Sequence, residues 1–415
     1  MIPYRFPSLI LFITTVVTAT TCLAQNQTPI AYETPPVFRA CDLVSADLLV
    51  GPQHRVREAV TTDGFTNTYI IDSDFGSFYA HGNDRLPERI REIYAIAGIR
   101  QTKESDAYKK ALSGAAKDTV NGAVNLVKDP IGSVKGAGKG AARFFKGASE
   151  RMRVNTDGSD AAADLKKYGS ARRQIAGQYG VDPYTSNEVL RAEMDSLAQA
   201  TGAGGLTFSL MKVAIPGGIG TLVSGVSTSS DLNDTLIEEG PYNLRAENRR
   251  RLEQMGIGEA SIEAFLNHPA LNPKHQTVIT DSLMQLSNAQ GKAEFLRLAM
   301  AARSEEDAHF FQRNAQLMAT YNKNRSSIVN IVDFLGFPAA YTKDNKLVFP
   351  ALLDYGSWTE TGDRISQSFL AFSSSDLAIS GHEWVFTGTV SATAKQALAS
   401  RGIVVIEQAF QTLGR

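Results

Sequence analysis

Glu306 and His309 are the pair of side chains whose types and spacing could most directly do chemistry. Three positions apart on a predicted helix, they share one face. Carboxylate-bridged metal centres in helical bundles use this spacing, but they need two such pairs. The sequence has no second pair, and Glu306 falls in the first predicted helical turn, where acids stabilise the helix dipole. We therefore expect a structural role for the pair, with no metal and no cofactor.

The remaining histidines are dispersed. His268 and His275 flank a short loop, and His382 stands beside Glu383 at the start of a predicted strand. No HExxH or CxxC motif and no zinc-type spacing is present. Each histidine is therefore predicted to lie at the surface or at a helix end.

Nucleophile and phosphate-loop signals are incomplete. Ser224 lacks the first glycine of a G-x-S-x-G elbow, and Ser380 beside His382 has no group to orient the base. The glycines at 136, 138 and 140 lack the Lys-Ser/Thr ending of a phosphate loop. An enzyme stays an alternative, as a hydrolase whose Ser, His and acid converge from distant segments. A pocket holding His309 or His382 beside a carboxylate would favour it.

Residues 109–153 form the most unusual stretch, with ten Lys or Arg against three acids. Apolar side chains recur there at steps of three and four, which predicts a narrow stripe on a helix flanked by cations. The break at Asp129-Pro130 predicts two helices, over 104–128 and 130–148. We expect the stripe and cations of 109–148 to contact an anionic membrane surface or a partner helix. The expected contact residues are Val120, Val124, Val127, Ile131, Val134 and Phe145, with Lys117, Lys128, Lys135, Lys139, Arg143 and Lys146.

Two other uses of this stretch remain open. The stripe can pack inside the protein against the apolar segment 203–226, which Pro216-Gly217-Gly218 divides into two arms too short to span a bilayer. Alternatively, the chain is a structural subunit of a surface assembly. Nucleic acid is not expected as a partner, because the net charge of the chain is −1 and export separates it from nucleic acid. The sequence does not fix the oligomeric state.

The N-terminus predicts export. Arg5, an apolar core around Leu9–Ile13 and small residues at Cys22 and Ala24 are typical of a signal peptide cleaved after Ala24. Acylation of Cys22 is the weaker alternative. After cleavage Cys41 is the one remaining cysteine, so no internal disulfide is expected, and Cys41 is predicted to be a small buried residue. These features favour a periplasmic or secreted envelope protein that acts by binding.

The predicted fold is α+β and predominantly helical. A polar leader (25–38) precedes a small unit (39–101) with strands at 54–61, 66–72 and 76–81 in a meander, and a helix with Pro87 at its first position. Basic helices and the apolar hairpin (102–230) come next, including helices at 159–178 and 186–200.

The second half is predicted as a helical array (231–336) and a mixed α/β unit (337–415). Gly256, Asn272-Pro273 and Ser304 with Asp307 mark helix ends and starts in the array. In the last unit, strands are expected at 347–349, 368–373 and 382–390. Ser391 then caps a helix that ends at Gly402, and a final strand at 403–406 completes a β-α-β sheet.

Overall fold

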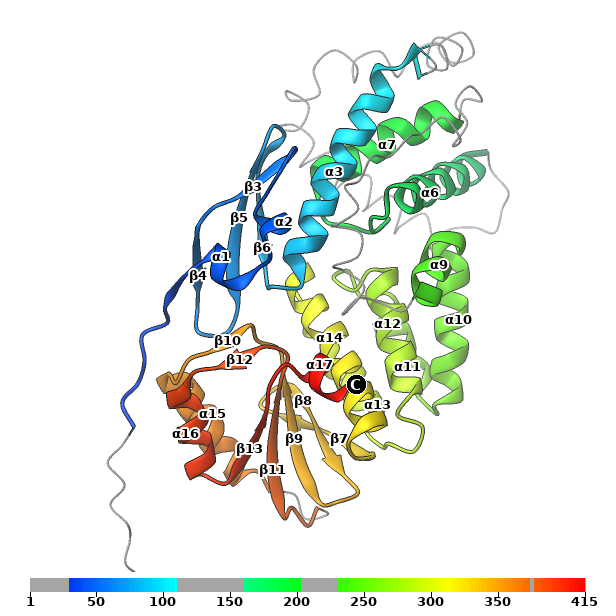
Figure 1. The fold of residues 1–415 in the computed structure, drawn as a ribbon. Coiled ribbons are helices and arrows are strands. Elements are labelled where there is room, and N and C mark those ends of the chain that lie inside the picture. The colour runs from blue at the N-terminus through cyan, green and yellow to red at the C-terminus, as the bar shows by residue number, and fades with distance from the viewer. Residues whose placement is uncertain (1–29, 107, 110–159, 203–229, 374–376, 415) are drawn as a thin grey trace, which may run out of the picture. The chain divides into compact units, whose positions relative to one another are not determined.

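The computed structural model describes residues 30–106, 108–109, 160–202, 230–373 and 377–414 (Figure 1). The chain divides into two units, Met1–Ala31 and Tyr32–Arg415, and the second unit contains every helix and strand described below. The predicted signal peptide, the basic segment beyond Lys109 and the hairpin at 203–229 lie outside the described residues. The structural assignments made for these segments therefore stay predictions.

The N-terminal part of the second unit is an antiparallel sheet. Its strands are β1 (Val37–Arg39), β2 (Val50–Gly51), β3 (His54–Val56), β4 (Ala59–Thr62), β5 (Asn67–Ser73) and β6 (Gly76–His81). Both β3 and β4 pair with β5 along one edge, and β6 pairs with the other edge of β5. The predicted meander is therefore part of a larger sheet. It gains β1 and β2, and the predicted strand at 54–61 is divided between β3 and β4.

Helix α3 (Arg85–Glu104) covers this sheet, and Ile90, Ile93 and Tyr94 pack with Tyr69 and Ile71. Pro87 is its third residue rather than its first. Two short helices, α1 (Ala40–Leu43) and α2 (Ala46–Leu49), lie between β1 and β2. Cys41 is exposed on α1, so its predicted burial is wrong, and its thiol contacts Glu58.

The central part is helical. It contains α6 (Asp160–Tyr179), α7 (Glu188–Gly202), α9 (Ser230–Glu238), α10 (Pro241–Gln254), α11 (Glu259–Leu266), α12 (Pro273–Met284), α13 (Lys292–Ala299) and α14 (Glu305–Asn324). The predicted helix ends are confirmed. Asn272 caps α12, Ser304 and Asp307 form a capping box on α14, and Gly256 has a φ of 75° after α10.

A five-stranded mixed sheet forms the C-terminal part. Its strands are β7 (Ile328–Phe334), β8 (Phe337–Thr342), β9 (Lys346–Ala351), β11 (Gly381–Phe386) and β13 (Ile403–Ile406), in the order β13-β11-β9-β8-β7. The predicted β-α-β ending is confirmed, since α16 (Ala392–Ser400), capped by Ser391, joins the parallel strands β11 and β13. The predicted array ends earlier than 336, because β7 begins at Ile328.

Residues 368–373 belong to helix α15 (Glu360–Ala371) or come directly after it, so the strand predicted there is wrong. Short apolar runs suit either structure, and the cap at Thr359 determines the outcome here. A small parallel pair, β10 (Tyr355–Gly356) and β12 (Thr389–Val390), and the last helix α17 (Ala409–Leu413) complete the part.

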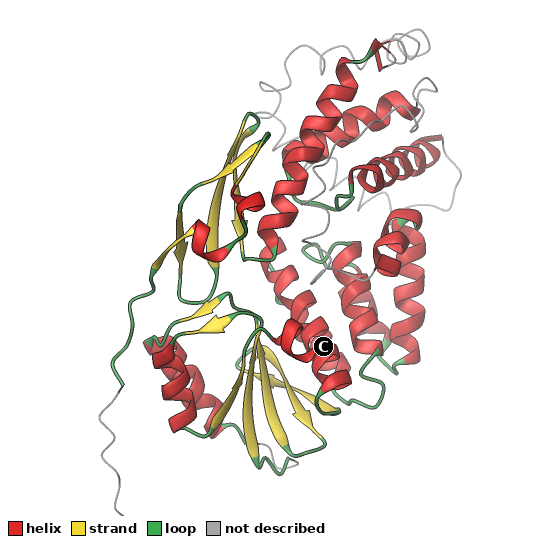
Figure 2. Ribbon diagram, in the orientation of Figure 1, coloured by secondary structure: helices red, strands yellow, loops and turns green. Residues whose placement is uncertain are grey.

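Helices lie on both faces of this sheet (Figure 2). Val348 and Val385 pack with α14, whereas Phe349 and Trp384 point to the opposite face and contact Phe369 of α15. The α+β class is therefore confirmed. Among the described helices, none combines the length and apolar character needed to cross a membrane.

Candidate functional site

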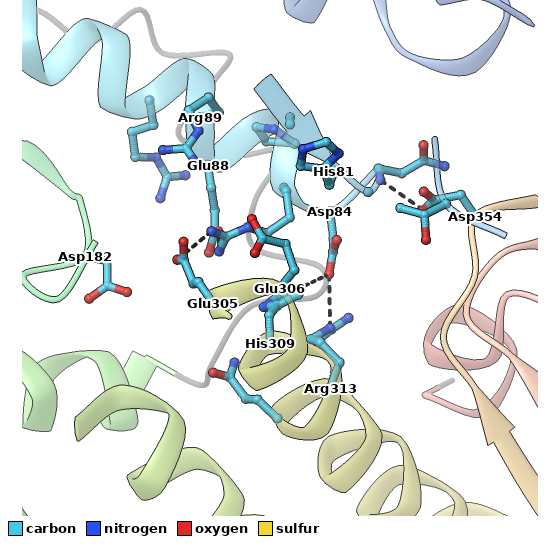
Figure 3. A pocket seen from close by; sticks show the side chains of 18 of the residues that line it. His81, Asp84, Glu88, Arg89, Asp182, Glu305, Glu306, His309, Arg313 and Asp354 are labelled. Atoms are coloured by element: carbon cyan, nitrogen blue, oxygen red, sulfur yellow. Dashed lines mark hydrogen bonds and ion pairs between the residues drawn. The ribbon is translucent and has the colours of Figure 1, made fainter. Parts of the chain in front are cut away.

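A pocket of about 1250 Å³, with both charged and apolar side chains in its lining, is formed by residues far apart in the sequence. The start of α3, the loop that leads into α7, the first turns of α14 and the segment around Asp354 all contribute to it (Figure 3). Its volume suits a ligand of several rings or residues. At the start of α3, Gly82, with a φ of 110°, lets β6 turn sharply into Asp84 and the helix.

Asp84, His309 and Arg313 form the centre of the pocket. His309 and Arg313 lie four residues apart, on one face of α14, and both contact Asp84 (Figure 3). Nε2 of His309 is 3.0 Å from Oδ2 of Asp84, and Nε of Arg313 is 3.2 Å from the same oxygen. Burial opposes ionisation of Asp84, but His309 and Arg313 outweigh it and lower the pKa of Asp84 to about 2.

This arrangement fixes the orientation of the imidazole. An ionised Asp84 accepts a hydrogen bond, so Nε2 of His309 carries a proton, and in the neutral imidazole Nδ1 is the acceptor nitrogen. Nδ1 is buried and has no hydrogen-bond partner within the described chain. Asp84 therefore fixes the ring through Nε2, and no group of the described chain bonds Nδ1.

Asp354 is a second carboxyl group in the pocket, with the opposite electrostatic environment. Its oxygens accept the backbone N–H groups of Asn67 (2.8 Å) and Asn83 (2.9 Å). Burial raises the pKa of Asp354 to about 6, although these two donors favour the ionised form. A Cβ placed on Gly82 would lie 2.9 Å from Oδ1 of Asp84 and 4.0 Å from Oδ2 of Asp354, so the two carboxyl groups are neighbours.

A network of ion pairs forms the rest of the pocket wall. Arg85 bridges Glu88 and Glu305, and Lys274 bridges Glu88 and Asp182. Burial opposes ionisation of Glu88, yet Lys274 and Arg85 hold the pKa of this carboxyl well below its usual range. These groups satisfy one another and give the pocket a rigid, charged wall.

The remaining sequence candidates are found elsewhere or play other roles. Glu306 lines the pocket but is exposed, and the described residues contain no group of three metal-ligating side chains. Ser380 bonds the carbonyl of Asn345, and His382 packs against Phe369, so they form no catalytic pair.

Two histidines are buried rather than at the surface. His275 still lies at a helix end, in the first turn of α12, as predicted, whereas His54 in strand β3 does not. His275 is 2% exposed, and its Nδ1 lies 2.8 Å from Oε1 of Gln312, while burial lowers the pKa of His275 to about 4. His54 is also buried and bonds the carbonyl of Leu48. The burial of these two side chains was not recognisable from spacing, because both histidines are flanked by polar residues.

All twelve predicted membrane or partner contacts, from Lys117 to Lys146, lie outside the described residues, as do Ser224 and the glycines at 136–140. Sequence reasoning missed Asp84, Arg313 and Asp354. One signal was present for Arg313: the polar run Gln312-Arg313-Asn314 lies in mid-helix, and all three side chains are buried. Polar groups buried in this way need partners, which here are His275 of α12, Asp84 of the pocket and the Pro350 carbonyl of β9.

Comparisons with protein-family models, curated proteins and solved structures find no match to this chain.

Proposed function

We propose that this chain is an exported hydrolase of the cell envelope and that the pocket at Asp84, His309 and Asp354 is its active site. The observation that carries the proposal is that His309 is fixed on Asp84 through Nε2, while its buried Nδ1 has no partner among the described residues. The signal-peptide pattern at residues 1–24 supports the location. A histidine beside a carboxylate in a pocket is also the feature that favours an enzyme over a purely binding protein.

In this mechanism His309 acts as the general base. In the neutral imidazole, Nδ1 accepts a proton from a water molecule that enters the site beside this buried atom, and the oxygen of that water attacks the electrophilic centre of the substrate. Asp84 and its partner Arg313 keep the ring oriented, and the ionised Asp84 stabilises the imidazolium that forms. No serine or cysteine of the described chain is hydrogen-bonded to His309, so water is the proposed nucleophile.

Asp354 acts as the general acid. A carboxyl group whose pKa is raised to about 6 stays protonated in mildly acidic solution and can donate its proton to the leaving group. The neighbouring Asp84 is ionised over the same range, so the two groups have separate roles. Hydrolysis then ends with protonated His309 and ionised Asp354, and both groups exchange protons with solvent before the next turnover.

The test is hydrolysis by the purified mature chain of a panel of 4-nitrophenyl esters, glycosides and phosphodiesters and of fluorogenic peptides. His309→Gln removes the base and should lower kcat roughly 10²- to 10⁴-fold for any compound that the wild type cleaves. His382→Gln is the matched control, because His382 lies outside the pocket. Asp354→Asn should remove the fall in rate that the wild type shows as pH rises through about 6.

The proposal fails if the wild type cleaves nothing in the panel, or if His309→Gln and His382→Gln have the same rate. Circular dichroism and a thermal unfolding curve of each variant separate loss of activity from loss of fold.

A further inference from the structure

Strand β6 is an edge strand that runs along the pocket. It pairs with β5 alone, and no other strand of the described chain pairs with it. All residues from Ser77 to Gly82 line the pocket. An unpaired strand edge exposes backbone N–H and C=O groups that can pair with another extended chain.

The register shows which residues of β6 present these groups. The carbonyl of Ile70 on β5 accepts the N–H of Arg57, so the backbone groups of Ile70 face away from β6. Its neighbours Tyr69 and Ile71 therefore bond β6, opposite Ala80 and Phe78. The alternate residues Ser77, Tyr79 and His81 direct their backbone groups outward. Of these groups, the Tyr79 carbonyl accepts a bond from Arg89, 3.2 Å away.

The side chains beside this edge are also accessible. Tyr79 is 54% exposed and stacks on His81, with ring centroids 6.5 Å apart and nearly parallel planes. Phe78 and Ala80 point the other way, into the core beneath α3. An added strand would thus meet an outward backbone edge with an aromatic pair on one face.

The charge of the pocket indicates which extended ligand it can bind. Its described lining has nine carboxyl groups against five Lys or Arg side chains. The cations are engaged within the wall: Arg85, Arg89, Lys274 and Arg313 pair with carboxylates, and Arg91 donates to the Gly180 carbonyl. By contrast, no Lys or Arg of the described chain is paired with Asp354 or Glu306. An anionic ligand would have to break existing ion pairs, whereas a cationic one would not.

We propose that the pocket binds an extended peptide containing Lys or Arg, which adds to the sheet along the outer edge of β6. Backbone pairing at the Tyr79 N–H and at His81 supplies affinity, and the surplus carboxyl groups select the basic side chains. The inference concerns the same pocket as the proposed hydrolysis, but it does not depend on the hydrolytic step. A peptide bound there would lie beside Asp84, which comes three residues after β6.

The experiment measures fluorescence anisotropy of a labelled hexapeptide of alternating Lys and Val, using the His309→Gln protein so that hydrolysis cannot consume the probe. Tyr79→Pro removes the outward N–H and leaves the β5–β6 bonds, whereas Tyr79→Ala keeps that N–H and loses only the exposed ring. Tyr79→Pro should weaken binding on the order of tenfold relative to Tyr79→Ala.

Two peptide controls test the same point without altering the protein. The hexapeptide with alternate amides N-methylated should bind on the order of tenfold more weakly, and the Glu-Val counterpart should not bind. Equal binding of Tyr79→Pro and Tyr79→Ala, equal binding of the acidic and basic peptides, or no binding of the basic peptide overturns the proposal. Binding without any hydrolysis by the wild type would instead contradict only the proposed function.

Discussion

Asp84 and Asp354 show how one pocket gives two identical side chains opposite acid strengths. Asp84 is next to an imidazole and a guanidinium, which stabilise the negative charge. Asp354 is buried and accepts two backbone N–H groups, and no Lys or Arg of the described residues pairs with it. The difference comes from charged partners and not from burial alone, since burial opposes the ionisation of both groups.

Asp354 should make the protein less stable as pH rises from about 4 to about 6. Its pKa is raised to about 6 in the folded state, so the unfolded chain ionises first and releases its proton at lower pH. The stabilisation is complete below the unfolded pKa and is lost as pH rises through the folded pKa. The loss should be roughly 2–3 kcal/mol, and Asp354→Asn should abolish it. Urea unfolding of the wild type and of Asp354→Asn at several pH values measures this loss of stability. Parallel pH profiles of the two proteins would contradict the prediction.

Glu383 should give the stability of the protein the opposite dependence on pH. It is 1% exposed in its side chain and accepts bonds from Tyr321, Arg325 and Lys346. Burial opposes its ionisation, but these partners lower the pKa of Glu383 to about 2. Its stabilisation is therefore present above the unfolded pKa and is lost as pH falls toward 2.

Glu383→Gln should lower the free energy of unfolding by about 3 kcal/mol at neutral pH, because Arg325 and Lys346 lose their shared carboxylate. The control is Glu407→Gln, because Glu407 pairs with the half-exposed Lys395. Denaturant unfolding of the two variants compares their losses in the free energy of unfolding. A smaller effect for Glu383→Gln than for Glu407→Gln would show that the buried cluster contributes little.

At the scale of elements, the turn before β12 holds Asp354 in place. A Cβ on Gly388 would overlap the backbone oxygens of Asp354 and Leu353, so this close approach requires glycine. Gly388→Ala should therefore destabilise the protein by about 1–3 kcal/mol and displace Asp354 from Asn67 and Asn83. Thermal unfolding of Gly388→Ala and of the control Gly402→Ala tests the predicted destabilisation. The pH profile of stability tests the predicted displacement of Asp354. Gly402 has no atom within 4 Å of its Cβ position, so only its positive φ of 74° is strained there.

The elements that sequence predicted well are those with local signals. Ser304 with Asp307, Asn272 and Gly256 determine helix ends through interactions within a few residues. The strands β1 and β2 have no such signal. They are short, and they form through antiparallel pairing, of Val37–Arg39 with β4 and of Val50–Gly51 with β3. Pairing of that kind depends on the whole sheet.

The site was only partly predictable for the same reason. Spacing singled out His309, but its function depends on Asp84, which is 225 positions away in the sequence. Asp354 is likewise tied to Asn67 and Asn83 across more than 250 positions. A local sequence pattern cannot contain two residues that lie more than 200 positions apart. A carboxylate of an ordinary polar loop therefore looks the same in the sequence as a carboxylate of a pocket.

At the scale of the whole molecule, charge is distributed unevenly. Residues 109–153 carry +7, from ten Lys or Arg and three acids, so the rest of the chain carries −8. A net charge near zero therefore conceals two regions of opposite sign. The basic one can meet an anionic surface even though the whole protein would not be attracted to it at long range.

We predict that the mature chain, from Gln25, co-sediments with vesicles containing anionic lipid at about 0.1 M salt and is released at about 1 M, where the screening length falls to about 3 Å. Replacing Lys135, Lys139 and Arg143 by Gln should weaken binding at least tenfold, since each cation near such a surface contributes about 1 kcal/mol. The matched control replaces three exposed cations elsewhere, Arg303, Lys323 and Lys343. Equal losses in the two variants would show an effect of net charge alone. Binding by neither the wild type nor the variants would leave the alternative in which the apolar stripe packs against residues 203–226.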